Sequence, residues 1–447
     1  MVIISAESMR VHLLKSSLSQ SIDNHTHQHI QSVVSPKIHG GLLFVQIRIF
    51  ACTLSDYSML PSLYAEYEPR PLIIGILGGG QLAKMLSQEV YKMGMSTAII
   101  EHGEYSPAGM MTSLSWGTGW NDRDALDAFI EASDIITLEN EFIAPEILEY
   151  ISTKRPVFPL PETISLVQDK FTQKETMQKA GIAITPFMAC HTIADIHAFG
   201  EQYGYPFVMK TRTLGYDGYG NATIRSASEI EASWNRFQDP EAPREIMCEA
   251  FVQFTKELAV MVARNRRGEM AVYPCVETIQ ENHICRYVLA PARVEDAIAE
   301  KANIMAKQCI EAIHGIGVFG IEMFLTNTGE VLFNEIAPRP HNSGHYTIEA
   351  CYASQFENGI RAILNLPLGS PEMKVPASVM VNLLGTRNGP GMPDSPVDTL
   401  KHSHTTIHLY GKKECRKGRK MGHLTTCGST LEDAAKEAYS AASSWIW

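Results

Sequence analysis

Two glutamates in neighbouring segments, Glu322 in GIEMFLTN and Glu335 in GEVLFNEIAPRPHNSGHYT, have the spacing of a paired site. If Thr328-Gly329 forms a two-residue hairpin loop, counting outward along both strands places Glu322 directly across from Glu335. Two facing carboxylates repel each other unless a cation bridges them, and Mg²⁺ prefers such oxygen ligands when it also binds nucleotide phosphates. The spacing therefore indicates a magnesium site, although a one-residue slip in register would separate the two side chains onto opposite faces.

A lysine followed by a glycine-rich loop lies upstream, in PFVMKTRTLGYDGYGN. An expected strand ends at Lys210, and the loop after it holds Gly215, Gly218 and Gly220. Glycines let backbone amides approach phosphate oxygens closely, and the lysine ammonium adds a point charge that can reach them. The segment favours phosphate binding, although an ordinary hairpin loop has the same composition.

Several other polar residues are weaker candidates for ligand contacts. Asp169 could cap a helix and Lys170 could present a cation, while Glu249 and Glu257 in CEAFVQFTKELAVMV could accept hydrogen bonds from ribose hydroxyls. Further on, KKECRKGRKMGH concentrates six Lys and Arg residues in an otherwise acidic chain, which favours a local anion site. Taken alone, each is also compatible with a solvated surface.

The segment GILGGGQLAKM indicates a different chemistry. Gly78 to Ala83 fits the G-x-G-x-x-A pattern of dinucleotide-binding loops, and Glu101 closes the next apolar run, where such sites place an acid. From these residues alone, a nicotinamide oxidoreductase is a candidate.

The elements that must position these residues alternate short apolar strands with helical stretches. Strands are expected in LIIGIL, STAIIE and IITLE, with helices from about Gln81 and around Ala125 to Ala132, which make a βαβ unit with a parallel sheet. A second region begins near Ser165 with the helix QDKFTQKETMQKAG, and a third begins near Pro371. The third contains the strand TIHLYG and a helix from Leu431 to Ala442.

These patterns predict an α/β protein of several domains. We expect residues 1–70 to form a disordered extension, 71–164 a Rossmann-like domain, 165–370 a central domain, and 371–447 a small β-rich domain. The extension also weakly permits a transit peptide, because it has few acids and scattered Arg and Lys residues.

Composition limits the functional class. The chain has 447 residues, of which 45% are hydrophobic and 19% are charged, as in soluble globular proteins, and no apolar run reaches about 18 residues. A net charge of -11 opposes broad binding to nucleic acid or to anionic membranes. Nine cysteines without a C-x-x-C pair suit a reducing compartment, and we expect a cytoplasmic protein.

Taken in order, these motifs resemble those of the ATP-grasp superfamily and, within it, the N5-carboxyaminoimidazole ribonucleotide synthetases of purine biosynthesis. The resemblance covers about Leu72 to Ala442 and rests on GILGGGQLAKM, TLENEF, QDKFTQKE, MKTRTLGYDGYGN, FNEIAPRPHNSGHYT and GRKMGH. It implies an ATP-grasp fold behind a Rossmann-like pre-ATP-grasp domain, whose glycine loop faces a ribonucleotide rather than NAD. The implied homodimeric ligase uses ATP, Mg²⁺ and bicarbonate to carboxylate aminoimidazole ribonucleotide through carboxyphosphate.

The resemblance also implies roles for individual residues. ATP would contact Lys170, Lys210, Gly215, Tyr216, Asp217, Gly218, Gly220, Asn221, Glu249, Phe251, Glu257 and His283. Mg²⁺ would be held by Glu322, Glu335 and Asn334. The ribonucleotide would contact Gln81, Leu82, Glu139, Asn140, Glu141 and Arg339, and its phosphate would contact Lys412, Arg419 and Lys420. Catalytic roles would fall to Arg339, His341 and Asp217.

Three alternatives stay open at this point. One is another ATP-grasp ligase that activates formate or glycine, the second is the nicotinamide oxidoreductase, and the third is a non-catalytic fragment. In some organisms this synthetase is fused to a following mutase domain, as phosphoribosylaminoimidazole carboxylase. The chain ends about where that domain would begin, so we expect either a stand-alone synthetase or a truncated fusion.

Overall fold

A computed structural model describes residues 32–39, 42–49, 70–215, 220–238, 244–281 and 284–447. The chain divides into two units, Met1–Leu60 and Pro61–Trp447. In the first unit, β1 (Ser32–His39) pairs antiparallel with β2 (Leu42–Ile49). These two segments are strands where disorder was expected, and their apolar and β-branched residues favour that conformation. The rest of the expected extension, residues 1–31, 40–41 and 50–69, lies outside the described residues.

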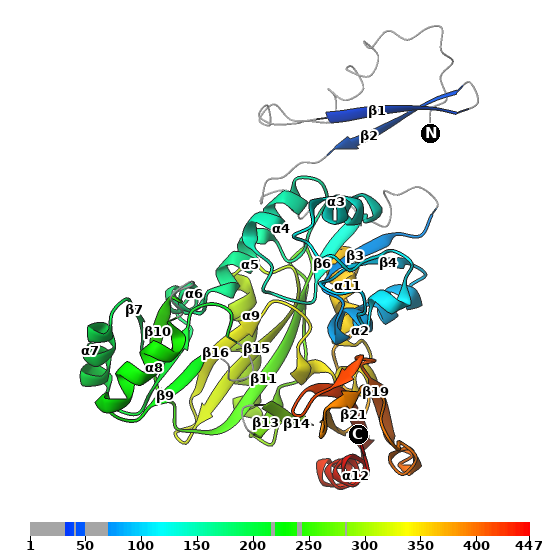
Figure 1. Ribbon diagram of the computed structural model, residues 1–447. Helices are drawn as coiled ribbons and strands as arrows, with labels where there is room; N and C mark the ends of the chain where they lie inside the picture. Colours follow the sequence, from blue (N-terminus) through cyan, green and yellow to red (C-terminus); the bar gives the residue numbers. More distant parts are fainter. Residues whose placement is uncertain (1–31, 40–41, 50–69, 216–219, 239–243, 282–283) are drawn as a thin grey trace. The chain divides into compact units, whose positions relative to one another are not determined.

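The second unit opens with a parallel sheet in the order β5-β4-β3-β6 (Figure 1). Its strands are β3 (Ile73–Leu77), β4 (Ser96–Ile100), β5 (Ser115–Trp116) and β6 (Ile135–Leu138). The helices of this region are α2 (Gln81–Lys92), η3 (Gly109–Met111), α3 (Arg123–Ala132) and α4 (Pro145–Ser152). The predicted βαβ unit is confirmed. Because parallel strands end at one edge, the glycine loop after β3 and the acidic segment after β6 lie together.

A small antiparallel sheet follows, in the order β7-β10-β8-β9. It contains β7 (Phe187–Cys190), β8 (Phe207–Thr211), β9 (Asn221–Ile224) and β10 (Ile246–Ala250). One face packs against α7 (Ile193–Tyr203) and α8 (Ile230–Phe237), next to the short η4 (Ala227–Glu229). Two helices, α5 (Pro161–Gln168) and α6 (Lys170–Lys179), link this sheet to the first domain. The helix predicted over QDKFTQKETMQKAG is confirmed as α6, with Asp169 as its N-cap, and α5 precedes it.

A nine-stranded sheet forms the centre of the unit, in the order β16-β15-β11-β13-β14-β17-β21-β19, with β12 on β11. The strands are β11 (Phe254–Arg264), β12 (Met270–Val272), β13 (Val276–Glu281), β14 (Ile284–Ala290), β15 (Gly317–Thr326), β16 (Val331–Ala337), β17 (Ala377–Leu384), β19 (Thr405–Leu409) and β21 (Lys420–Gly428). Its helices are α9 (Asp296–Ala312), η5 (Asn342–Gly344), α10 (Thr347–Ala350), α11 (Gln355–Ile363), η6 (Thr399–Lys401) and α12 (Leu431–Ser443). A two-stranded ribbon joins β18 (Gly389–Pro390) to β20 (Glu414–Cys415).

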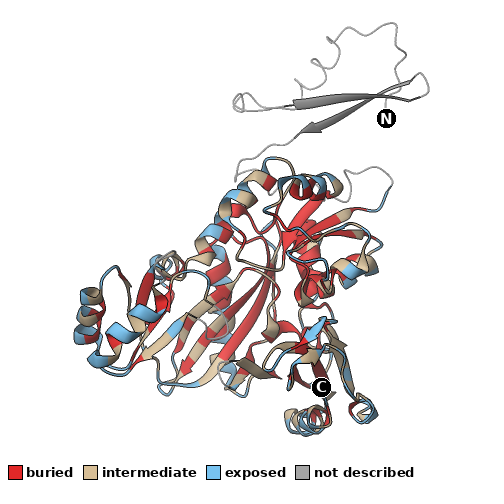
Figure 2. Cartoon of the chain, in the orientation of Figure 1, coloured by how far each residue is buried: buried red, intermediate tan, exposed pale blue. Residues whose placement is uncertain are grey.

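The two faces of β11 and β15 have different neighbours. Leu258, Val260 and Phe319 pack under α9, whereas Ala259 and Met261 pack with the chain around α10. Figure 2 shows the resulting buried band along the middle of the large sheet. Alternation along β15 therefore directs Glu322 away from the α9 core.

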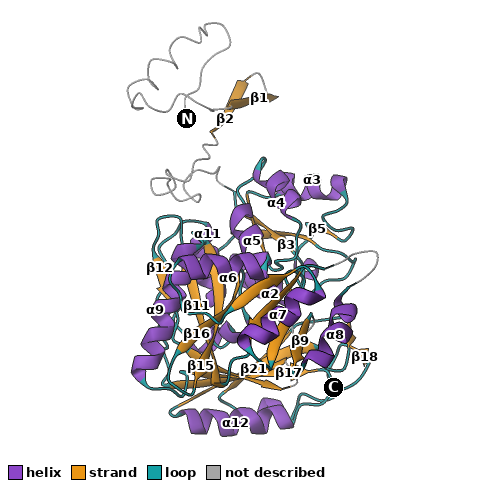
Figure 3. Ribbon diagram, turned by 90° about the vertical axis from the view of Figure 1, so that its left-hand side faces the viewer, coloured by secondary structure: helices purple, strands orange, loops and turns teal. Residues whose placement is uncertain are grey.

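The strands of the expected C-terminal domain, 371–447, continue this same sheet, because β17 pairs with β14. The helix α12 packs under β17 and β21 (Figure 3), with Val379, Leu424 and Ala438 in one core cluster. No helix among the described residues combines the length and apolar character needed to cross a membrane.

The β15–β16 hairpin differs from its predicted form in one respect. The amide of Thr326 donates to the Glu330 carbonyl at 2.9 Å, so the loop has three residues and ends on Gly329, whose φ is 80°. The predicted two-residue loop is wrong, since a left-handed glycine closes the longer turn instead. A bulge at Asn334 then compensates, and Glu322 still pairs with Glu335 as predicted.

Candidate functional site

A cavity of about 370 Å³ lies between the small sheet and the large sheet. Ten of the residues predicted to bind ATP or metal line it, namely Lys170, Lys210, Gly215, Asn221, Glu249, Phe251, Glu257, Glu322, Asn334 and Glu335. Four residues predicted for the ribonucleotide or for catalysis line the same cavity, namely Glu141, Arg339, His341 and Lys420. The structure thus places both groups of residues around one continuous space.

Some predicted residues cannot be placed. Tyr216, Asp217, Gly218 and His283 lie outside the described residues. Their predicted contacts with ATP, and the catalytic role of Asp217, stay predictions. Gly220, at the other end of this loop, is described and has a φ of 82°. A side chain there would be strained and would meet Thr211 Oγ1 at 2.5 Å, so a glycine is required.

The first two turns of α6 carry two lysines that pair with acids of the cavity wall, and Lys170 lines the cavity itself. Asp169 caps the helix by accepting from the amides of Phe171 and Thr172 at 2.9 and 3.1 Å, which confirms its predicted capping role. Lys170 forms an ion pair with Glu335, and Lys174, one turn later, pairs with Glu249 at 2.9 Å. The cap therefore fixes the direction of both ammonium groups.

Glu249 lies between two cations on the wall formed by the small sheet. It contacts both Lys174 and Lys210, and all three side chains are buried. Burial alone would raise the pKa of Glu249, but the two neighbouring ammonium groups lower it to about 2. Glu249 is therefore ionised at neutral pH and holds Lys210 at the cavity surface.

Glu322 and Glu335 face each other on the opposite wall. Burial and the nearby carboxylates of Glu335 and Glu257 raise the pKa of Glu322. Burial acts in the same direction on Glu335, but the ammonium of Lys170 outweighs it and lowers the pKa of Glu335. The pair thus has one strongly ionised carboxylate beside one that resists ionisation until a further cation arrives.

The bulge adds a third oxygen ligand to this wall. Phe333 and Ile336 both lie in the α9 core, and this odd spacing requires one extra residue between them. That residue is Asn334, whose Nδ2 lies 3.4 Å from Glu322 Oε2 and whose buried Oδ1 has no hydrogen-bond partner. An unpartnered amide oxygen beside two carboxylates is a donor set suited to Mg²⁺.

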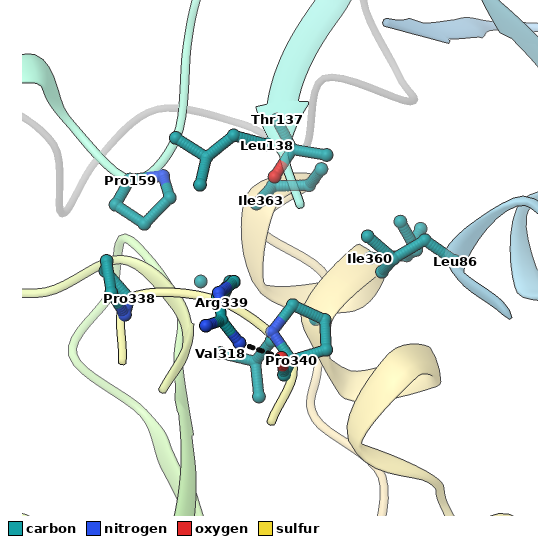
Figure 4. A pocket seen from close by; sticks show the side chains of 12 residues that line it. Leu86, Thr137, Leu138, Pro159, Val318, Pro338, Arg339, Pro340, Ile360 and Ile363 are labelled. Atoms are coloured by element: carbon teal, nitrogen blue, oxygen red, sulfur yellow. Dashed lines mark hydrogen bonds between the residues drawn. The ribbon is translucent and has the colours of Figure 1, made fainter. Parts of the chain in front are cut away.

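Arg339 connects this cleft to the first domain. Its Nη2 donates to Glu141 Oε1 at 2.7 Å, and Glu141 belongs to the segment after β6. Figure 4 shows Arg339 beside a small pocket of about 10 Å³ that is lined by Leu138, Val318 and Ile363, among others. This pocket has room for about one water, and Arg339 also lines the larger cavity.

His341 is oriented from both of its ring nitrogens. Nδ1 lies 2.8 Å from Ser343 Oγ, and Nε2 lies 3.4 Å from Glu322 Oε1. Burial, together with the positive charges of Arg339 and Lys420, lowers the pKa of His341 to about 3. The imidazole is therefore neutral at pH 7 and can donate or accept one hydrogen bond at the cavity.

The glycine loop after β3 is filled by the protein's own carboxylates. Glu139 accepts from the amides of Gly80 and Ala83 at 2.7 and 2.9 Å, and Glu101 accepts from Gly79 at 2.8 Å. A side chain on Gly80 would meet Glu139 Oε1 at 2.6 Å. The amides that bind pyrophosphate in dinucleotide sites are thus already satisfied, which speaks against the nicotinamide reading.

The other residues predicted for the ribonucleotide are not among those that line the cavity. Leu82 is buried in a core cluster, so only its backbone is available, and Asn140 Oδ1 accepts from the amide of Phe142 at 2.8 Å. Lys412 Nζ donates to the Lys420 carbonyl at 2.8 Å, and Arg419 Nη1 donates to the Glu414 carbonyl at 2.8 Å. Gln81 begins α2.

Two cations in the site were missed by the sequence reasoning. Lys174 follows Lys170 at helical spacing, which could have placed it on the same face. Arg212 pairs with Asp169 at 2.5 Å and, since it lies two residues after Lys210 in a loop, no periodicity indicates it.

Three domain families match consecutive parts of the chain. Residues 72–168 match the ribonucleotide synthetase preATP-grasp domain, 175–356 the ATP-grasp domain, and 378–437 the phosphoribosylaminoimidazole carboxylase C-terminal domain.

Relatives match over most of the chain. Phosphoribosylaminoimidazole carboxylase of Candida albicans is 41% identical over 376 residues, which cover 81% of this chain but 65% of the relative. N5-carboxyaminoimidazole ribonucleotide synthase of Bacillus subtilis is 36% identical over 353 residues, which cover 79% of this chain and 90% of the relative. This chain therefore spans about two thirds of the first enzyme and nearly all of the second.

Solved structures give the same result. Carboxyaminoimidazole ribonucleotide synthase from Aspergillus clavatus, complexed with ATP, has a TM-score of 0.76 and 35% identity, and the match covers 83% of this chain and 98% of that one. The synthetase from Thermotoga maritima has a TM-score of 0.75 and 40% identity, with 84% and 99% covered. With the ATP-grasp fold, the preATP-grasp domain and the C-terminal domain all in place, the chain belongs to the N5-carboxyaminoimidazole ribonucleotide synthase family.

Proposed function

We propose that this chain uses ATP to carboxylate 5-aminoimidazole ribonucleotide with bicarbonate, giving N5-carboxyaminoimidazole ribonucleotide. One observation carries the proposal: a single cavity joins the lysines and the carboxylate pair of the two sheets to Arg339, His341 and Lys420. The reaction has two steps that share an unstable intermediate, carboxyphosphate, and both steps must take place in one space. A related Aspergillus clavatus synthase has been solved with ADP and 5-aminoimidazole ribonucleotide together.

The first step makes bicarbonate reactive. A bicarbonate oxygen attacks the γ-phosphorus of ATP, the bond to the β-phosphate oxygen breaks, and carboxyphosphate and ADP form. Lys170 and Lys210 reach the cavity from opposite walls and would neutralise charge on the phosphoryl oxygens. Both ammonium groups are held by acids, so ATP phosphates would take over contacts that are already prepared.

Magnesium fits the same wall. Glu322, Glu335 and Asn334 would hold it, and when bound it would neutralise charge on the β- and γ-phosphates. Among the described residues, no three His, Cys, Asp or Glu side chains form a metal site by themselves. We therefore infer that the ion needs oxygen ligands from the nucleotide as well.

In the second step the exocyclic amine of the ribonucleotide forms a bond to the carboxyl carbon. The bond from that carbon to the phosphate oxygen breaks, inorganic phosphate leaves and the amine loses a proton. Arg339 would stabilise the anionic carboxyphosphate, since it places a guanidinium at the wall of the cavity. His341, neutral at pH 7, would orient the intermediate or the amine from Nε2. Lys420 lines the ribonucleotide end of the cavity and would contact the phosphate, with Lys412 bonded to its carbonyl.

The proposal concerns the ATP-dependent step alone. The carboxylase named among the longer relatives is a protein of which this chain spans 65%. A homodimeric assembly and a cytoplasmic location also stay proposals, and they rest on the resemblance and on the composition.

The decisive experiment measures ADP release by the purified chain with MgATP and bicarbonate, with and without 5-aminoimidazole ribonucleotide. We expect strong stimulation by the ribonucleotide and an acid-labile carboxylated product. Stimulation by formate or glycine in place of bicarbonate would instead identify another ATP-grasp ligase. A thermal shift with NAD but none with MgATP would revive the oxidoreductase reading, and ATP binding without turnover would indicate a non-catalytic fragment.

A further inference from the structure

Three successive backbone carbonyls at the end of β19 are gripped by side chains of the first domain. Lys84 Nζ donates to the carbonyls of Leu409 and Tyr410 at 2.9 and 3.4 Å, and the Tyr105 hydroxyl donates to the carbonyl of Gly411 at 3.0 Å. Lys84 lies on α2, and Tyr105 follows β4. We call Leu409–Gly411 the gripped segment.

Packing holds the same segment in place. The Tyr410 side chain is 2% exposed and lies in the core cluster that contains Leu82 and Met85 of α2. Its hydroxyl lies 3.1 Å from His423 Nδ1, on β21. Gly411 has a φ of 77°, and a side chain there would come within 3.5 Å of Lys84 Nζ. The backbone path is therefore fixed from both domains.

The residue that follows the gripped segment contacts a residue of the cavity wall. Lys412 comes next in the chain, and its Nζ donates to the carbonyl of Lys420 at 2.8 Å. Lys420 lines the cavity beside His341. A shift of the gripped segment would move Lys412 directly and would loosen its hold on the strand that carries Lys420.

Lys84 is an unusual residue for mere domain packing. Among the described residues its ammonium donates to backbone carbonyls and forms no ion pair, and burial lowers its pKa. Partly burying an ammonium without a carboxylate partner costs free energy, and the two carbonyl contacts of Lys84 are ones that an apolar side chain could not make. Lys92, on the same helix, shows the ordinary case: it pairs with Glu89 at 3.1 Å and with Glu357 at 3.2 Å.

We propose that Lys84 and Tyr105 are positioning residues that hold the gripped segment so that Lys412 and Lys420 bind the phosphate of the ribonucleotide. The inference rests on the proposed function, because it assigns these two residues to one substrate of that reaction. They act through Lys412 and Lys420, and they need not touch the ligand.

The test separates the two substrates kinetically. ADP release is measured for Lys84→Met and Tyr105→Phe while either the ribonucleotide or MgATP is varied, with inorganic phosphate as a competitor of the ribonucleotide. We expect Lys84→Met to raise the ribonucleotide KM about tenfold, which corresponds to about 1.4 kcal/mol, and Tyr105→Phe to raise it about threefold. The inhibition constant of phosphate should rise in parallel, while the KM of MgATP and kcat change less than about twofold.

Two further variants keep the test decisive. Lys84→Arg retains a donor to the same carbonyls and should recover much of the ribonucleotide affinity, and it also serves if Lys84→Met does not fold. Lys92→Met removes the other lysine that links α2 to a later domain, and should lower the melting temperature without changing either KM.

The outcomes are distinguishable. Unchanged ribonucleotide KM in folded Lys84 and Tyr105 variants overturns the inference while leaving the proposed function intact. An equal rise in the KM values of both substrates, or the same rise in Lys92→Met, would show that Lys84 only helps the domains to pack and does not position the phosphate site. Absence of ribonucleotide-stimulated ADP release in the unaltered chain would instead refute the proposed function itself.

Discussion

At the scale of single residues, the described site pairs its main cations with acids. Lys170 contacts Glu335, Arg339 contacts Glu141, and Glu249 contacts both Lys174 and Lys210. Each partner keeps its cation in a fixed direction, which reduces the reorganisation needed when phosphate arrives. Substitution of Glu335 and of Glu249 can therefore test two different roles, metal binding and the holding of two lysines.

Glu335→Gln tests the metal assignment. The substitution keeps the shape of the side chain but removes a charged ligand, so Mg²⁺-dependent ADP release should fall about a hundredfold or more. Circular dichroism and the melting temperature should show a folded protein. Glu330→Gln, an exposed residue of the same hairpin, is the control and should leave turnover unchanged. Near-normal activity of Glu335→Gln would refute the metal site.

Glu249→Gln tests the buried charge cluster through pH. Burial alone would raise the pKa of Glu249, but Lys174 and Lys210 hold it at about 2, below the ordinary value of about 4.3. A lowered carboxyl pKa stabilises the fold above the ordinary value, and this contribution is lost as pH falls through the lowered one. The substitution should therefore cost roughly 3–5 kcal/mol at pH 7, and less as pH falls from about 4 toward 2.

Urea unfolding at several pH values measures this difference. Glu245→Gln is the control, because that carboxylate is 64% exposed and its contact with Arg212 is 3.4 Å long. A cost for Glu249→Gln that stays constant from pH 7 to pH 3 would mean that the two lysines do not hold this carboxylate ionised.

At the scale of elements, the proposed function makes the start of α6 a link between helix formation and nucleotide binding, through Lys170. Asp169→Ala removes the cap and the partner of Arg212, which should cost about 1 kcal/mol and misdirect Lys170. The KM of MgATP should rise several-fold. Asp122→Ala removes the same kind of cap from α3, away from the cavity, and should lose similar stability with no change in KM. Equal KM values in both variants would refute the coupling.

The β15–β16 hairpin shows what the sequence allows to be predicted at this scale. Counting residues from the turn placed Glu322 opposite Glu335, and this pairing is confirmed. The count made the loop one residue too short, and it did not include the bulge at Asn334 that compensates for this difference. Bulges depend on which side chains the far core accepts, here Phe333 and Ile336 under α9, and that partner lies outside the local pattern.

The glycine loop after β3 shows where a local sequence pattern predicts the wrong ligand. Its pattern and the following acid favoured a dinucleotide site, yet Glu139, distant in sequence, occupies two of its amides. Only the parallel pairing of β3 with β6 brings that carboxylate to the loop. Family resemblance corrected this reading, whereas local physical reasoning could not.

At the scale of the whole molecule, the expected C-terminal domain is part of the central sheet. Its β17 pairs with β14 from Tyr287↔Val381 to Ala290↔Ser378. Pro and Gly residues near Pro371 suggested a boundary, and they lie in the connection between α11 and β17. A pairing between strands about ninety residues apart leaves no periodic signal in either strand, so the continuity of the sheet was not predictable.

This continuity makes a prediction about truncation. Ending the chain after Ser370 would remove β17, β19 and β21 and would leave β14 as an open edge. It would also remove Met380 and Tyr410 from core clusters that contain residues of the ATP-grasp and preATP-grasp regions. We expect the product to be insoluble or to lack a cooperative thermal transition.

Removal of residues 1–69 is the matched comparison, since the family matches begin at residue 72. That product should stay soluble, melt cooperatively and release ADP at the rate of the full chain. A soluble 70–370 fragment with cooperative melting and ATP binding would show that the C-terminal strands form an independent domain despite their pairing. In that case folding would not need the contacts of Tyr410 with the first domain. Their effect on ribonucleotide binding would then be the remaining explanation for them.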